Sequence, residues 1–176
     1  MDPVVSNSTP LIYLAKVGRL DLLKKVFGKV LIPQEVKVEV VDKGKLLGEQ
    51  DAYLVEKAIH EGWIEVLVAD PLEMSMVLDK GEGAALALAK QLGIKDVLLD
   101  EVSARSAARL LDLTPRGTVF VLLKALQNKD IDLDAFIEIL NDLVRHHFRL
   151  KEEVYLEALK EARKIASEKC GRNPQK

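Results

Sequence analysis

Residues 4–12 of this 176-residue chain pass from an apolar, β-branched run into small polar residues and then into a proline. Two valines are followed by residues 6–9, and Pro10 precedes an apolar-periodic segment. This order predicts a buried strand that turns directly into a helix. Open α/β sheets bind ligands at the carboxyl ends of their strands, because strand ends and helix N-termini converge there. We therefore expect the polar tip of this segment to face a crevice.

Further along the chain, short apolar runs alternate with helical patterns, which predicts a mainly parallel sheet covered on both faces by helices. Gly18 divides the first helical stretch, Pro33 is expected to open the third helix, and Gly44 to cap it. The segment 70–78 stays ambiguous. Strands are expected at 29–32, 64–68 (near an edge) and 96–100, and helices at 11–27, 33–42, 49–61, 81–92, around 104–111, 117–127, from Asp132 or Asp134 to 144, and 152–166.

The length suits one domain, because domains usually run to about 100–150 residues and no repeat or linker interrupts this chain. We expect a single domain over residues 1–170, with a helical portion from about 132 and a frayed tail at 171–176. That helical portion either packs on the sheet or forms a partner surface. The one cysteine, Cys170, excludes an intrachain disulfide and favours a reducing compartment. Without a signal peptide or a run of ~20 apolar residues, a cytoplasmic protein without membrane association is expected.

Three acidic positions, Glu39, Glu82 and Asp100, fall near helix starts that could face the crevice. Glu39 could equally share an exposed helix face with Glu35, and a carboxylate at Glu82 is stabilised by the helix dipole in any case. Asp100 is the most informative, because it ends an apolar strand, where a charge must be solvated, hydrogen-bonded or paired. The sequence leaves open whether these three side chains meet.

Several polar neighbours also have ordinary structural interpretations. Asn7, Ser8 and Thr9 commonly cap helices, and here a helix is expected from about Pro10. Asp79 is a candidate N-cap for the helix that contains Glu82. Glu101 is expected to serve the first turn of the helix that follows Asp100. None of these roles excludes a second role at a ligand site.

Other kinds of site have little support in the residues. The three histidines, His60, His146 and His147, lack the spacing of zinc ligands. Gly81-Glu82-Gly83 matches neither phosphate-binding glycine motif, and no Ser or Cys nucleophile has a credible His partner. The net charge of −2 does not by itself indicate a nucleic-acid binder. If the acids converge, a cluster of hard oxygen ligands favours Mg²⁺ or Mn²⁺ and attack of water on a phosphodiester.

The motifs occur in a recognisable order along roughly residues 4–160. They are Val-Val-Ser-Asn-Ser-Thr-Pro-Leu-Ile at 4–12, Leu-Ala-Lys-Val-Gly-Arg-Leu at 14–20, Ile-Pro-Gln-Glu-Val at 32–36 leading to Glu39, Leu-Asp-Lys-Gly-Glu at 78–82, Ala-Leu-Ala-Leu-Ala at 85–89, Leu-Leu-Asp-Glu at 98–101, and Gly117-Thr118. The chain resembles a PIN-domain protein, specifically the uncharacterised prokaryotic branch whose members look like the VapC-type toxin nucleases.

This resemblance implies a three-layer α/β/α sandwich and a Mg²⁺- or Mn²⁺-dependent ribonuclease acting on RNA. It also implies a homodimer and an antitoxin protein as partner. Carried over by position, Asn7, Glu39, Glu82 and Asp100 would surround the metal. Ser8 and Thr118 would support metal-bound water or phosphate, with Asp79 and Glu101 as supporting neighbours.

The chain departs from the family pattern at two positions. Asn7 stands where family nucleases usually have Asp, and Ala84 stands where the third motif often has a second acid. Losing one charge beside a dication matters, since unit charges ~4 Å apart interact by about 4 kcal/mol at an effective dielectric near 20. Two hypotheses follow: a metal-dependent endoribonuclease, such as the toxin of a toxin–antitoxin pair, or a PIN-like binding or regulatory module without hydrolysis. A phospho-accepting receiver domain is weaker, because the first strand ends in Asn7 and not in an acidic pair.

Overall fold

The computed structural model describes residues 1–73 and 77–170, and these residues contain a five-stranded sheet in which all paired neighbours are parallel. Its strands are β1 (Val4–Ser6), β2 (Val30–Pro33), β3 (Ile64–Leu67), β4 (Asp96–Leu98) and β5 (Thr114–Arg116). Their order is β3-β2-β1-β4-β5, so the sequence segment at β1 lies in the centre. The parallel sheet, and the edge position of the strand near residue 64, are confirmed.

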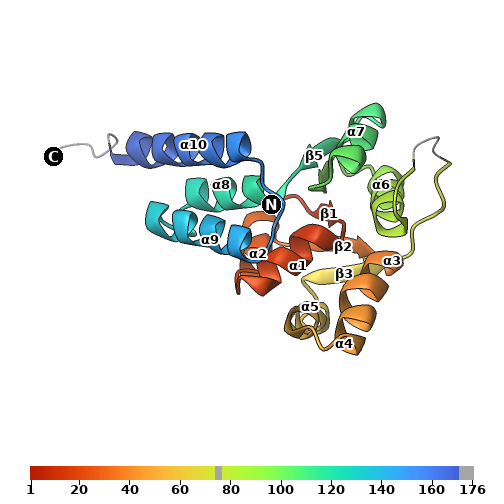
Figure 1. Cartoon of the computed structure of the whole chain (residues 1–176). Coiled ribbons are helices and arrows are strands. Elements are labelled where there is room, and N and C mark those ends of the chain that lie inside the picture. Colours follow the sequence, from red (N-terminus) through yellow and green to blue (C-terminus); the bar gives the residue numbers. More distant parts are fainter. Residues whose placement is uncertain (74–76, 171–176) are drawn as a thin grey trace.

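Helices cover both faces of this sheet, which confirms the three-layer α/β/α arrangement (Figure 1). One face packs against α6 and α7, and the other packs against α1, α2, α5 and α8. The helical segments are α1 (Ser8–Lys16), α2 (Asp21–Phe27), α3 (Gln34–Lys37), the π-helix η1 (Val38–Lys43), α4 (Gly44–Leu46), α5 (Gln50–His60), α6 (Lys80–Leu92), α7 (Val102–Leu110), α8 (Thr118–Asn128), α9 (Leu133–Arg145) and α10 (Glu152–Cys170). Within the described residues, no helix is long and apolar enough to cross a membrane.

The central strands are apolar on both sides because each side meets a separate hydrophobic core. In β1, Val4 enters the core beneath α1 and α8, whereas Val5 enters the core beneath α6 and α7. Leu98 and Val97 of β4 divide between the two cores in the same way. Alternate side chains of a strand point to opposite faces, so a strand buried on both faces must be continuously apolar. Polar residues are consequently confined to the strand ends.

The structure corrects two predictions in the third helical stretch. Pro33 ends β2 and does not open the helix, which begins at Gln34. Gly44 does not cap the helix, since its φ is −57° and the helical path continues through η1 into α4. A Cβ at Gly44 would lie 2.8 Å from the Cβ of Ala52, so glycine is needed there for close packing against α5.

Two further details differ from, or complete, the sequence prediction. The strand β5 was not predicted, because Pro115 lies at its centre and proline removes a ladder donor. An edge strand tolerates this loss, and β5 is an edge of the sheet. Asp132, and not Asp134, caps α9, since its carboxylate accepts a hydrogen bond from the Ala135 N–H at 2.8 Å. Residues 70–73 and 77–79 have no regular secondary structure.

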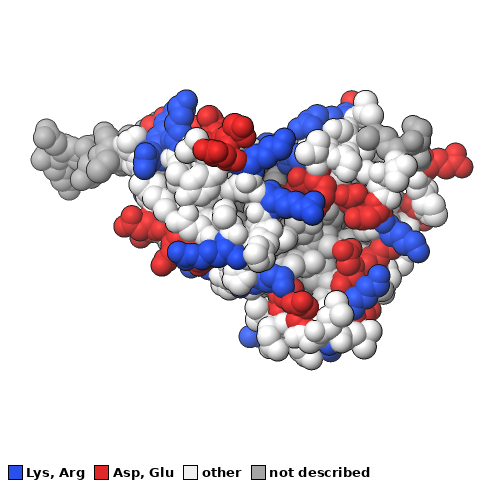
Figure 2. Space-filling view, in the orientation of Figure 1, with Lys and Arg blue, Asp and Glu red and all other residues white. Residues whose placement is uncertain are grey.

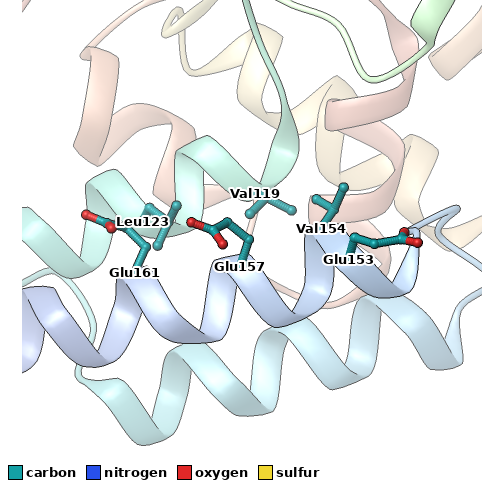
Figure 3. Close-up of a pocket in the computed structure, with 7 residues that line it drawn as sticks. Val119, Leu123, Glu153, Val154, Glu157 and Glu161 are labelled. Carbon is teal, nitrogen blue, oxygen red and sulfur yellow. The ribbon is translucent and has the colours of Figure 1, made fainter.

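The C-terminal helices pack on the body of the fold. Phe136 of α9 and Ala162 of α10 are both fully buried, in the same core that contains Val4 of β1. This continuous core is why we propose a single domain over residues 1–170. A groove of about 550 Å³ remains between α8 and α10, and Figure 3 shows its apolar side chains from both helices with glutamates along α10. The tail predicted at 171–176 lies outside the described residues.

Phe136→Ala should lower the free energy of unfolding by about 3–5 kcal/mol, because a large buried ring is replaced by a cavity. The measurement is urea unfolding followed by circular dichroism and by fluorescence of Trp63, the only tryptophan in the chain. Trp63 belongs to the same core, so both signals should shift together. Leu156→Ala on the exposed side of α10 is the control and should change little. An unchanged Trp63 transition would mean that the C-terminal helices unfold separately.

Candidate functional site

The tip of β1 continues straight into α1 and places three polar side chains at the C-terminal edge of the sheet. The Asn7 N–H donates to the Leu98 carbonyl at 3.1 Å, which extends the β1–β4 pairing past the strands. Helix α1 begins at Ser8, earlier than predicted, and Asn7 has the extended backbone of an N-cap. Its side chain, however, makes no capping hydrogen bond. The side chains of Asn7, Ser8 and Thr9 instead reach acidic residues from other segments, so Asn7 occupies the predicted N-cap position without the predicted side-chain cap.

Glu39 is joined to the β1 tip through Ser8. The Ser8 hydroxyl donates to Oε2 of Glu39 at 2.6 Å, across 31 positions of sequence. Glu39 lies in η1, which follows directly from β2 through α3. A Cβ at Gly81 would lie 3.0 Å from the same Oε2 atom, so the glycine allows the start of α6 to approach Glu39 closely. The exposed residue Glu39 is therefore held by Ser8 and lies against the start of α6.

Glu82 is held by a capping box at the start of α6, and Asp79 is the N-cap that the sequence indicated. The Glu82 N–H donates to Asp79 Oδ1 at 2.7 Å, and the Asp79 N–H donates to Glu82 Oε2 at 3.1 Å. Burial raises the pKa of Glu82, and the negative charges of Asp79, Glu101 and Glu39 raise it further. The carboxylates of Asp79, Glu101 and Glu39 therefore act electrostatically on Glu82.

Asp100 is clamped by Thr118 at the start of α8. Its Oδ1 accepts from the Thr118 N–H at 2.8 Å, and its Oδ2 accepts from the Thr118 hydroxyl at 2.7 Å. Burial raises the pKa of Asp100 from 3.8 to about 6, with a smaller contribution from the charge of Glu101, although the Thr118 hydrogen bonds oppose this rise. A Cβ at Gly117 would lie 3.0 Å from Oδ1, so this glycine leaves room for the carboxylate.

Glu101 does more than the helix-start role that the sequence predicted. It precedes α7 but makes no side-chain capping hydrogen bond there. Its Oε2 accepts from Asn7 Nδ2 at 3.2 Å, and its Oε1 accepts from the Thr9 hydroxyl at 2.6 Å. Glu101 is therefore fixed against the first turn of α1.

Gly81 belongs to this region although the sequence analysis did not assign it to the site, and Thr9 and Arg105 lie there as well. Arg105 donates from Nη1 to the Leu99 carbonyl at 2.9 Å and lies beside Gly117 and Asp100. A glycine within the first turn of a helix costs up to about 1 kcal/mol relative to alanine, so Gly81 could have been recognised as a packing requirement. Arg105 follows Glu101 by four positions, a spacing that places both at the start of α7.

The acidic residues gather over β1, α3 and α6, and Lys and Arg side chains border this group in Figure 2. All potential ligands in the group are oxygens, the donor type that hard divalent cations prefer. Asn7 is 3% exposed, and its Oδ1 is buried without a hydrogen-bond partner, as an oxygen awaiting a cation or a water would be. In chemistry, these residues fit a divalent cation. In geometry, no group of three or more His, Cys, Asp or Glu side chains among the described residues is already arranged to hold one.

One comparison with known proteins agrees with this fold. A family model described as a PIN domain matches residues 3–164, which is most of the chain. Neither the curated proteins nor the solved structures gave a match. The resemblance seen in the motifs is thus confirmed at the level of the PIN domain.

Asp100→Asn should stabilise the metal-free protein at pH 7.5, because the variant removes a buried charge, while the amide oxygen can accept from the Thr118 N–H and the amide nitrogen can donate to the Thr118 hydroxyl. A pKa raised from 3.8 to about 6 corresponds to on the order of 3 kcal/mol. Wild-type stability is lost as the pH rises through this range, so the advantage of the variant should vanish as the pH falls toward 4.

Urea unfolding of both proteins in chelator, from pH 4 to pH 8, measures this difference. Asp134→Asn, at an exposed position in the first turn of α9, is the matched control and should show little pH-dependent difference. A variant less stable than the wild type at pH 7.5 would show that the folded protein favours the Asp100 charge.

Proposed function

Because this chain belongs to the PIN-domain family, we propose that it is a Mg²⁺- or Mn²⁺-dependent endoribonuclease that hydrolyses RNA phosphodiesters, in the manner of VapC-like toxins. PIN domains are generally nuclease folds that use divalent metal ions. The observation that carries the proposal is the unpartnered, buried Oδ1 of Asn7 at the edge of the sheet where the carboxylates gather. Negatively charged oxygen ligands are the type that hard divalent cations prefer.

In this proposal, Asn7, Glu39, Glu82 and Asp100 hold the cation. When bound, a divalent cation supplies the positive charge that stabilises a phosphodiester under attack by water. Ser8 and Thr118 orient the carboxylates of Glu39 and Asp100 through the hydrogen bonds described above. Asp79 fixes the start of α6 and thereby the position of Glu82. Such preorganised hydrogen bonds keep the acids from rearranging when substrate arrives.

Arg105 is the basic residue best placed to meet an RNA phosphate, because it lies beside Asp100. Arg116 and Arg145, which are other basic residues of this part of the sequence, form ion pairs with Asp96 and Asp142 at 2.9 and 2.7 Å. Phosphate contacts position a nucleic acid without reading its sequence, so this arrangement suits RNA binding of low specificity. A homodimer and an antitoxin partner are part of the same proposal and are supported by the family resemblance alone.

A binding module without hydrolysis is the second candidate. It is favoured by Asn7 and Ala84, which remove two charges from the family pattern, and by carboxylates that already have hydrogen-bond donors. Such a module would bind RNA or a protein equally well in the presence of a chelator. The two candidates therefore differ in a property that is simple to measure.

Purified wild-type protein should cleave single-stranded RNA in Mn²⁺ or Mg²⁺ and lose this activity in EDTA. Asp100→Asn and Glu82→Gln should each reduce the rate by about 10²-fold or more, since each removes a charge from the proposed cation site. Cleavage of a fluorescently labelled RNA measures the rate. Glu153→Gln is the matched control, because Glu153 lies on α10 beside the distant groove of Figure 3, and it should retain wild-type activity.

Cleavage that survives in Asp100→Asn would point to a contaminating nuclease. A wild-type protein that is inert across divalent metals and RNA substrates, yet binds RNA in EDTA, would replace the nuclease proposal with the binding module.

A further inference from the structure

We propose that Glu101 supplies the negative charge that Asn7 lacks, so that the hydrogen-bonded pair Asn7–Glu101 takes the place of a carboxylate at the tip of β1. The inference rests on the cation binding that is part of the proposed function, but not on hydrolysis. It assigns Glu101 as a positioning residue for Asn7 and as a source of charge in the site.

The contacts of Glu101 are what carry this inference. Both of its carboxylate oxygens accept hydrogen bonds from the first residues of α1, from Asn7 Nδ2 at 3.2 Å and from the Thr9 hydroxyl at 2.6 Å. An amide at position 7 can donate to Glu101, whereas an aspartate could not and would place two negative charges side by side. Asparagine at position 7 and glutamate at position 101 are therefore chemically matched.

The same contact determines the state of the Asn7 amide. With Nδ2 committed to Glu101, the other arm of the amide, Oδ1, is left buried and without a hydrogen-bond partner. Buried carbonyl oxygens are seldom left unpaired in folded proteins. A cation would be coordinated by this oxygen and would also be attracted by the neighbouring negative charges. Glu101 thus fixes which atom of Asn7 is available as a ligand.

The charge of Glu101 also reaches the rest of the acidic group. Its carboxylate contributes to the raised pKa of Glu82 and to that of Asp100. The charge of Glu101 therefore acts both on Glu82 at the start of α6 and on Asp100 after β4. A charge in this position can attract a cation to the site even though position 7 is neutral.

A charge-swap series tests the inference, with Mn²⁺ as the probe and calorimetric titration as the readout. Glu101→Gln should weaken Mn²⁺ binding by about 10-fold or more, because one negative charge is lost. In the double variant Asn7→Asp with Glu101→Gln, the charge moves to position 7 and the glutamine amide can donate to it. The double variant should bind Mn²⁺ within about 3-fold of the wild type.

Asn7→Asp alone adds a negative charge opposite the Glu101 carboxylate, which cannot donate a hydrogen bond to it. Its metal-free melting temperature should fall below that of the wild type, and saturating Mn²⁺ should raise it by more than it raises the wild type. Glu153→Gln on α10 is the control for loss of a distant carboxylate and should bind Mn²⁺ like the wild type. If Glu101→Gln does not fold, Thr9→Val tests the positioning role of Glu101, since loss of one of its two hydrogen bonds to the start of α1 should weaken Mn²⁺ binding severalfold.

Wild-type Mn²⁺ affinity in Glu101→Gln, or in Thr9→Val if that variant is needed, would overturn the inference. So would a double variant that binds no better than Glu101→Gln, or a wild-type protein that binds no Mn²⁺ at millimolar concentrations. The nuclease proposal fails on a different result: a protein that shows the expected binding pattern but cleaves no RNA would disprove hydrolysis and leave the role of Glu101 standing.

Discussion

The hydrogen bond from the Asn7 N–H to the Leu98 carbonyl is the contact on which the site depends. It continues the parallel pairing of β1 and β4 beyond the last paired residues, so the two segments of the chain leave the sheet side by side. The segment after β1 enters α1, and the segment after β4 reaches Asp100 and Glu101. Because both strands run in the same direction, their polar ends must meet at one edge. The distances between Asn7, Thr9 and Glu101 follow from this pairing.

Much of this arrangement could be predicted from the sequence, because apolar runs that alternate with helical periodicity leave few topologies open. What could not be predicted were contacts in which a distant partner replaces a local one. Thr9 and Glu101 were expected to serve their own helices, but 92 positions separate the two residues that actually bond. Local capping and long-range hydrogen bonding use the same side-chain atoms, and only the tertiary fold decides between them. The strand β5 was missed for a related reason, since proline is acceptable there only because β5 is an edge.

The acidic site is costly for the fold that carries it. The charged forms of Asp100 and Glu82 are less stable here than in water, so the pKa of each is raised, and burial is the main cause for both. Hydrogen bonds partly offset this cost: the Asp79 N–H donates to Glu82, and the Thr118 N–H and hydroxyl donate to Asp100, in both cases at a helix start. Residues that destabilise a fold while gathering at one edge are typical of functional sites, where stability is given up for chemistry.

The π-helix η1 has a consequence for how Glu39 is specified. A π-turn contains one more residue than the corresponding α-turn, and each residue of a helix advances by about 100° around its axis. Removing one residue between the end of β2 and Glu39 would turn the glutamate by about 100° around the helix axis, and its hydrogen bond with Ser8 would be lost. The number of residues between β2 and Glu39 is thus a determinant of the site, as much as the glutamate itself.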